Sequence, residues 1–236
     1  MKNSIVIFFL FLGISSFCQG FIAGIDEENI SLLMNKPVIA NLASGEELSG
    51  RLVSAVSING YLDKIAIKME NGEKVKLKPE DILRLMIKTS ELAKLSMIAD
   101  ATVSIKKMTG TDFEEIVNRD FFVFETAMRS NKRGKLRLMQ LLNPGFDSKI
   151  KVFADPNAQK TGGIDIGGFQ LTGGADKSYL FVENEEKAVK VKKGSYKKNF
   201  NELFKSCPEM VKAFEGKKIK WNDVAGHVFL YDQICK

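Results

Sequence analysis

Few side chains in this sequence combine the types and the spacing that catalysis requires. His227 is the only histidine among the 236 residues, and a catalytic cysteine would need it as its partner. The three cysteines, Cys18, Cys207 and Cys235, form no cluster with the three or four ligands of a zinc site, and the chain has no calcium-loop motif. We therefore expect no catalytic residue, no cofactor and no metal site, and we expect His227 to be a packed structural residue.

Lysines are the other side chains with a potential chemical role. The formal net charge is +6 and the isoelectric point is about 9.1. Two segments carry much of the excess: one holds Lys190, Lys192, Lys193, Lys197 and Lys198, and the other holds Lys217, Lys218 and Lys220. Such segments either bind an anionic surface, such as lipid phosphates or acidic glycans, or form a solvated face that keeps the protein soluble. The solvated face is favoured, and we expect no nucleic-acid partner, because few aromatic residues interleave with the lysines.

Three glycine pairs, at 162–163, 167–168 and 173–174, could suggest a phosphate-binding loop. They lack the Gly-Lys-Ser/Thr ending of a P-loop and the strand, Gly-x-Gly-x-x-Gly and helix order of a dinucleotide site. A turn-rich crossover is the favoured interpretation, and a ligand loop remains the alternative.

The first eighteen residues have the three parts of a secretory signal peptide. Lys2 gives a positive start, Ile5 to Leu12 form an apolar run, and Ser16 and Cys18 provide small residues for a cleavage site. The run is far shorter than the roughly 20 residues that span a bilayer. We expect cleavage before Gln19, a mature chain without a transmembrane segment, and a periplasmic or secreted location.

Cys18 could alternatively carry the lipid of a bacterial lipoprotein. Such a site needs a small residue just before the cysteine, where this chain has Phe17, and it usually has Leu where Ser15 stands. Simple cleavage is therefore favoured. In an oxidising compartment the two remaining cysteines, Cys207 and Cys235, are expected to form a disulfide.

Residues 36–88 have the pattern of a small β-barrel. Expected strands cover 38–42, 48–58, a run with Ile65, Ile67 and Met69 on one face, 74–77 and 83–87. Asn71-Gly72 predicts a tight hairpin, because both residue types accept positive φ. The Val38–Leu52 stretch, with its Gly-Glu-Glu-Leu-Ser-Gly core, resembles the opening strands of SH3-like and Sm-like barrels. That resemblance implies a fold and no particular function.

The remaining chain predicts an α+β fold: a small SH3-like β-barrel followed by a mainly antiparallel β region with C-terminal helices. We expect an N-terminal segment at 19–35, a linker at 89–118, and a final unit at 119–236. Strands are expected at 121–128, 136–142 and 149–154, with a hairpin that joins 179–183 to 188–192. Helices are expected over 195–205, after a Ser206-x-x-Glu209 capping box, and from 222 or 223 towards Cys235.

Several segments resemble exported proteins of unknown function from Gram-negative bacteria. They are the Leu141–Val152 stretch, the glycine-rich run from Thr161 to Gly174, and the ending from Cys207-Pro208 to Cys235. The resemblance covers most of the chain after about residue 110. It implies export and pairing of the two cysteines, and it implies no activity.

Two functional hypotheses follow. The first is an exported, non-catalytic binding or interaction protein of the cell envelope, whose partner is an unknown protein or an anionic envelope component. The alternative is a secreted hydrolase whose site is assembled from scattered residues. The lack of a usable histidine, cysteine or metal cluster favours the first hypothesis.

Overall fold

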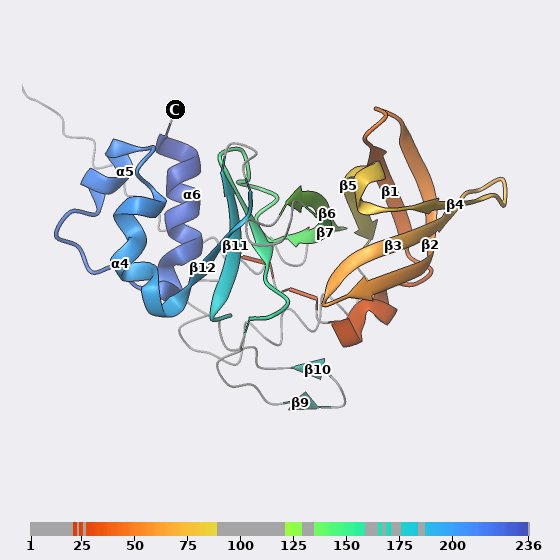
Figure 1. Ribbon diagram of the computed structural model, residues 1–236, viewed down its shortest axis with the longest axis horizontal. Coiled ribbons are helices and arrows are strands. Elements are labelled where there is room, and N and C mark those ends of the chain that lie inside the picture. The colour runs from red at the N-terminus through yellow and green to blue at the C-terminus, as the bar shows by residue number, and fades with distance from the viewer. Residues whose placement is uncertain are drawn as a thin grey trace, which may run out of the picture.

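A computed structural model describes residues 21–22, 24–25, 27–88, 121–128, 135–158, 165–166, 169–170, 176–183 and 187–235. The expected signal peptide, the 89–118 linker and the three glycine pairs lie outside these residues. The chain folds into a long antiparallel sheet with helices at its C-terminal end (Figure 1).

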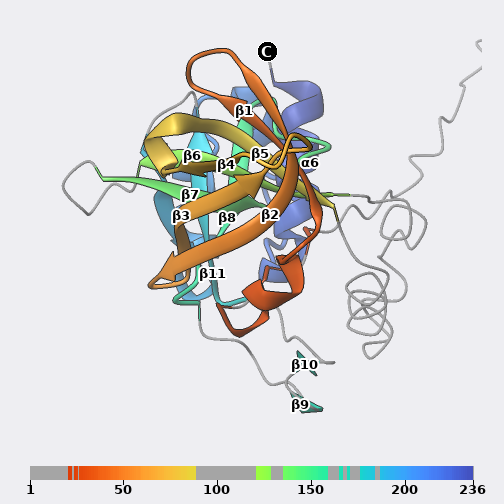
Figure 2. The ribbon, with the colours of Figure 1, turned by 90° about the vertical axis from the view of Figure 1, so that its right-hand side faces the viewer.

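Six strands close into an antiparallel barrel. Strand β1 pairs with β2 and β5, β2 pairs with β3, β5 pairs with β6, and β6 pairs with β7. The barrel closes where Leu62 of β3 lies opposite Leu138 of β7. The elements of this part are η1 (Glu27–Leu33), β1 (Pro37–Leu42), β2 (Glu47–Ile58), β3 (Tyr61–Lys68), β4 (Lys74–Leu77), η2 (Pro79–Asp81), β5 (Ile82–Lys88), β6 (Phe121–Met128) and β7 (Leu136–Leu141). Figure 2 views the molecule from the side of the barrel.

The barrel therefore draws two of its strands from beyond the 36–88 segment in which it was expected. Strand β6 lies against β5 over five residue pairs, from Arg84 opposite Glu125 to Lys88 opposite Phe121. Alternating burial within each strand is visible in sequence, whereas pairing between strands that are far apart in the chain is not. The α+β class is present, with additional strands and C-terminal helices next to the closed barrel.

The predicted Asn71-Gly72 hairpin is present, but only the second of its two residues has the positive φ that the prediction allowed for both. The Met69 N–H donates to the Glu73 carbonyl at 2.9 Å, and the Gly72 N–H donates to the Met69 carbonyl at 3.0 Å. Gly72 has a φ of +87°, whereas Asn71 does not have a positive φ. Its side-chain oxygen instead accepts a hydrogen bond from the Glu73 N–H at 2.9 Å. The result is a three-residue loop closed by a left-handed glycine.

Three further strands extend the sheet beyond β7. They are β8 (Ile150–Ala154), β11 (Ser178–Glu183) and β12 (Val189–Lys192), and the order across the whole sheet is β12-β11-β8-β7-β6-β5-β1-β2-β3-β4. The predicted hairpin between β11 and β12 is present, with Ser178 opposite Lys192. A separate short pair, β9 (Asp165–Ile166) and β10 (Phe169–Gln170), lies between β8 and β11 in the chain.

The C-terminal helices cover one face of the β8, β11 and β12 strands (Figure 1). They are α4 (Lys193–Leu203), α5 (Pro208–Ala213), η3 (Trp221–Asp223) and α6 (Val224–Ile234). The predicted Ser206 capping box is absent, because Cys207 is the N-cap residue of α5 and the Ser206 hydroxyl donates to Glu183 instead. No helix within the described ranges is long and apolar enough to cross a membrane.

Buried side chains in the described residues form three clusters. One fills the barrel, with Leu52, Ile67 and Leu85 at its centre. A second lies between the sheet and the helices and is rich in aromatic rings, among them Tyr196 and Phe200. The third lies on the opposite face of β8, β11 and β12, where it adjoins the barrel. Apolar burial of this kind is the main stabilising contribution to the fold.

Candidate functional site

The structure divides the first group of predicted lysines into two kinds. Lys190, on β12, lies 2.5 Å from a carboxylate oxygen of Asp155 and is paired with it. The other four, Lys192, Lys193, Lys197 and Lys198, are exposed, and no ion pair joins them to any other residue of the described ranges.

The partner of Lys190 is a fully buried carboxylate. Asp155 also accepts hydrogen bonds from the Ser178 hydroxyl at 2.7 Å and from the Asn157 N–H at 3.1 Å. Burial opposes ionisation of Asp155, but the hydrogen bonds from Lys190, Ser178 and Asn157 outweigh it and lower the pKa of the carboxyl below its usual value. Lys190 therefore neutralises an internal charge and is not part of a free cationic surface.

The second lysine group runs beside the first. The loop between α5 and η3 contacts α4 at two points: Phe214 packs on Phe200 with ring centroids 5.2 Å apart, and Trp221 packs on Tyr196 at 5.3 Å. Figure 1 shows this loop passing along α4. Because Lys217, Lys218 and Lys220 lie on the loop, they join the lysines of β12 and α4 at one end of the molecule.

Two hydrogen bonds to backbone carbonyls fix the starts of α4 and η3 in this region. The Lys193 N–H donates to the Lys177 carbonyl at 2.8 Å, and the Trp221 indole N–H donates to the Asp176 carbonyl at 2.8 Å. The start of α4 and the start of η3 are thereby tied to the same short stretch before β11. We call the exposed lysines gathered here the basic end: Lys192, Lys193, Lys197, Lys198, Lys217, Lys218 and Lys220.

The charge of the basic end works against the stability of its own helix. The first turn of α4 contains no acidic residue, and the N-cap Lys192 makes no side-chain capping bond. A helix N-terminus carries a partial positive charge, so cations there are unfavourable by a few tenths of a kcal/mol each. The amide dipoles and the lysines together concentrate positive potential on this surface. Such a surface can attract anions.

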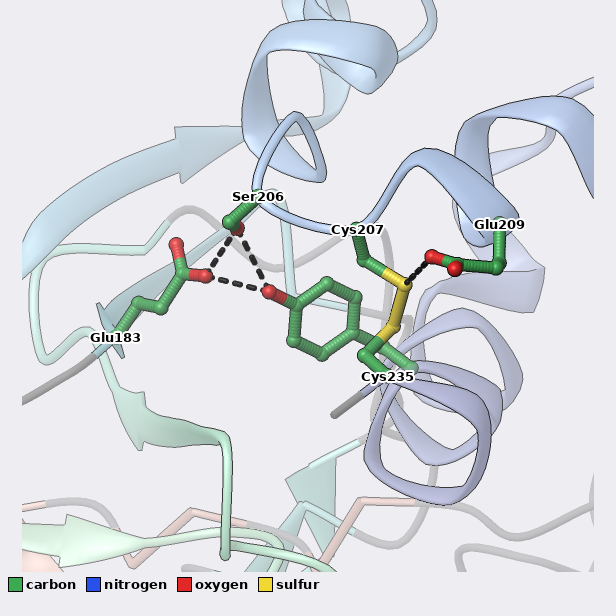
Figure 3. Close-up of a disulfide and its surroundings, with 6 residues drawn as sticks. Glu183, Ser206, Cys207, Glu209 and Cys235 are labelled. Carbon is green, nitrogen blue, oxygen red and sulfur yellow. Dashed lines mark hydrogen bonds between the residues drawn. A yellow bond between two sulfur atoms is a disulfide. The ribbon is translucent and has the colours of Figure 1, made fainter.

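A second polar cluster lies beside the disulfide (Figure 3). The sulfur atoms of Cys207 and Cys235 are 2.02 Å apart, with Cα atoms separated by 5.5 Å. Ser206 and Tyr231 both contact one oxygen of Glu183, and their hydroxyl oxygens lie 2.7 Å apart. Burial, followed by the hydrogen bond to Glu183, raises the pKa of Tyr231 to about 12. The cluster ties both ends of the disulfide loop to strand β11.

The structure gives His227 a tyrosine as its hydrogen-bond partner and surrounds it with aromatic rings. Its Nδ1 lies 2.8 Å from the Tyr196 hydroxyl, and the rings of Phe200 and Phe214 contact it edge-on. Burial lowers the pKa of His227 to about 4, with a smaller opposing effect from the Asp223 charge. Within the described residues four serines do meet carboxylates, in the pairs Ser44–Glu46, Ser148–Asp232, Ser178–Asp155 and Ser206–Glu183. None of these serines has the histidine as a base.

In the part of the chain that the structure describes, no three or more histidine, cysteine, aspartate or glutamate side chains lie close enough together to hold a metal ion.

Sequence reasoning missed the Asp155 partner of Lys190, because the two residues are far apart in the chain and only strand pairing brings them together. Trp221, directly after Lys220, was the available signal that the second lysine loop is anchored to the body.

Compared with protein families, curated proteins and solved structures, the chain matches none of them.

Proposed function

We propose that this protein is an exported, non-catalytic binding protein of the cell envelope, and that its basic end binds an anionic envelope component. The observation that carries the proposal is that two separate lysine segments lie along α4, since the loop with Lys217, Lys218 and Lys220 is held against this helix by Phe214 on Phe200 and by Trp221 on Tyr196. Seven exposed ammonium groups without ion pairs in the described ranges lie on α4, on the strand before it and on the loop beside it. Phosphate and carboxylate groups are the ligands that such a surface attracts.

Cations elsewhere in the molecule support this proposal by contrast. Arg84 and Lys151 pair with Glu125 at 2.6 and 2.7 Å, Arg137 pairs with Asp63 at 3.3 Å, and Lys190 pairs with Asp155. Each of these cations is thus neutralised by a carboxylate from another part of the chain. The lysines at positions 64, 68, 74 and 76 of β3 and β4 are also exposed and without ion pairs in the described residues, but those of the basic end lie beside a helix, and α4 bears a cost for the cations at its N-terminus.

We propose further that β1 to β5 form an SH3-like barrel core. Their order, β5-β1-β2-β3-β4, and the one-turn helix η2 between β4 and β5 support this assignment. Strands β6 and β7 would then be additions that complete the closure. A small barrel of this type serves many functions, so this assignment does not name a ligand.

Export is the second part of the proposal. The signal-like first eighteen residues, the resemblance to exported Gram-negative proteins and the paired cysteines all support a periplasmic or secreted location. Mass spectrometry of the exported protein tests this part. We expect a chain that begins at Gln19, and a diacylated Cys18 at the N-terminus would contradict the proposed cleavage.

Binding is tested with three probes and the mature wild-type protein: phosphatidylcholine vesicles, the same vesicles with phosphatidylglycerol, and heparin as a sulfated glycan. We expect binding to at least one anionic probe that weakens as salt rises, since exposed charges are screened. Preference for the vesicles would identify lipid phosphates as the ligand, and preference for heparin would identify acidic glycans. The proposal fails if neither anionic probe binds, or if neutral vesicles bind equally well.

A further inference from the structure

The two residues that begin the described chain enter different cores. Ile22 is 6 % exposed and belongs to the cluster that fills the barrel. Its neighbour Phe21 packs instead with the aromatic cluster beneath the helices, edge-on to Tyr179 at 5.0 Å and stacked with Phe146 at 6.2 Å. Adjacent side chains of an extended segment point in opposite directions, so one short segment can fill both sites. Phe21 and Ile22 therefore cover the junction between the barrel cluster and the aromatic cluster beneath the helices, and we call this junction the seam.

Two backbone amides hold the described residues of this segment. The Ile22 N–H donates to the Leu142 carbonyl at 2.9 Å, and the Ile25 N–H donates to the side-chain oxygen of Gln140 at 2.6 Å. Gly24 passes close to the end of β8, since a Cβ at this position would lie 3.3 Å from the Ala154 Cβ. Side-chain insertion, with these two hydrogen bonds, therefore fixes the segment, which adds no strand to the sheet.

We propose that the segment with Phe21, Ile22, Gly24 and Ile25 is a latch, which closes over the seam as a separate and last step of folding. The arrangement suits a segment that follows the expected cleavage site so closely. A protease that cuts before Gln19 needs the neighbouring residues to be extended and accessible. Phe21 is not accessible while its ring packs against Phe146 and Tyr179. The inference rests on the proposed export for its purpose, but its physical content and its test do not depend on the basic end.

The test uses the full mature chain with the double substitution F21A and I22A. A labelled synthetic peptide of residues 19–26 should bind this variant saturably and raise its melting temperature. It should bind the wild-type protein at least about tenfold more weakly, because the wild-type seam is already filled. A peptide in which Phe21 is replaced by Ala is the matched control and should bind the variant weakly. Equal binding of the two peptides, or equal binding to the two proteins, would overturn the proposal.

A second measurement keeps the proposal testable if the double variant does not fold. Native-state hydrogen exchange of the wild-type mature chain compares two backbone amides that both donate to carbonyls, Ile22 to Leu142 and Leu52 to Lys36. A latch that opens alone predicts faster exchange at Ile22, by at least about tenfold, while Leu52 exchanges only on wider unfolding. Equal protection at the two amides would mean that the segment opens only with the barrel, and would contradict a separate latch.

Discussion

The Tyr196 hydroxyl lies 2.8 Å from Nδ1 of His227, in a buried contact between the first and last C-terminal helices. The two rings also stack, with centroids 5.9 Å apart. Tyr196 is on α4, the helix that carries Lys193, Lys197 and Lys198 of the basic end. The contact therefore joins the helix that carries these lysines to α6.

Stability should fall as the medium becomes acidic, through His227. Burial lowers the pKa of this histidine from 6.5 to about 4. Between these values the unfolded chain binds more protons than the folded chain, so the free energy of unfolding rises with pH across that window. The expected loss on acidification from pH 7 to pH 4 is up to about 3 kcal/mol. Urea unfolding at several pH values measures it.

The matched control for this prediction is H227F, which keeps a ring in the site and removes the titrating group. Asp155 remains in both proteins, and because its pKa is lowered, its contribution is lost only below its ordinary value of 3.8. The dependence above pH 4 should therefore be flatter in H227F than in the wild type. Identical profiles for the two proteins would show that His227 is not the titrating group.

The disulfide should stabilise the helical end against unfolding. Cys207 and Cys235 are separated by 28 positions, and closing such a loop stabilises by about 3 to 4 kcal/mol on the chain-entropy account. C235S should therefore melt at a lower temperature than the wild type under oxidising conditions. Reductant should lower the melting temperature of the wild type and leave that of the variant unchanged. Alkylation that finds two free thiols in the natively exported protein would refute the pairing.

Glu125 should be the most sensitive carboxylate of the sheet. Its side chain is 8 % exposed and accepts charge-assisted bonds from Arg84 on β5 and Lys151 on β8. E125Q leaves Lys151 without its anion and leaves Arg84 with Asp147 as its remaining carboxylate partner, and we expect a loss of about 2 to 4 kcal/mol in urea unfolding. E80Q is the control, since Glu80 is exposed and lies 3.9 Å from its partner Lys78. Equal effects of the two substitutions would contradict this account.

Strands and turns were predictable because their signals are local. The alternation around Ile65 and Ile67 gave β3, and the Asn71-Gly72 pair gave the hairpin that follows it. Closure of the barrel was not predictable in the same way. It depends on a contact between Leu62 and Leu138, which lie on strands far apart in the chain, and no local pattern encodes it.

The candidate site was predictable only as two separate lysine segments. Sequence spacing alone could not show that Trp221 rests on Tyr196 and so brings Lys220 beside α4. Sequence spacing also could not show that Lys190 is paired and so does not belong to the exposed lysines. Its partner Asp155 follows β8, and β11 lies between β8 and the strand β12 that carries Lys190. Ser206 was expected to cap a helix, but tertiary contact with Glu183 engages its hydroxyl instead.

The central claim, that the basic end is the binding surface, is tested most directly by comparing two lysine-to-glutamine variants with the wild type. The first replaces Lys192, Lys193, Lys197 and Lys220. The control replaces four exposed lysines of β3 and β4, at positions 64, 68, 74 and 76, so that the loss of net charge is equal.

The measurement is the affinity of each mature protein for phosphatidylglycerol vesicles and for heparin. We predict that the first variant loses at least about tenfold on the probe that the wild type prefers, while the control stays close to the wild type. An equal loss in both variants would show that net charge alone drives binding and would contradict a specific basic end.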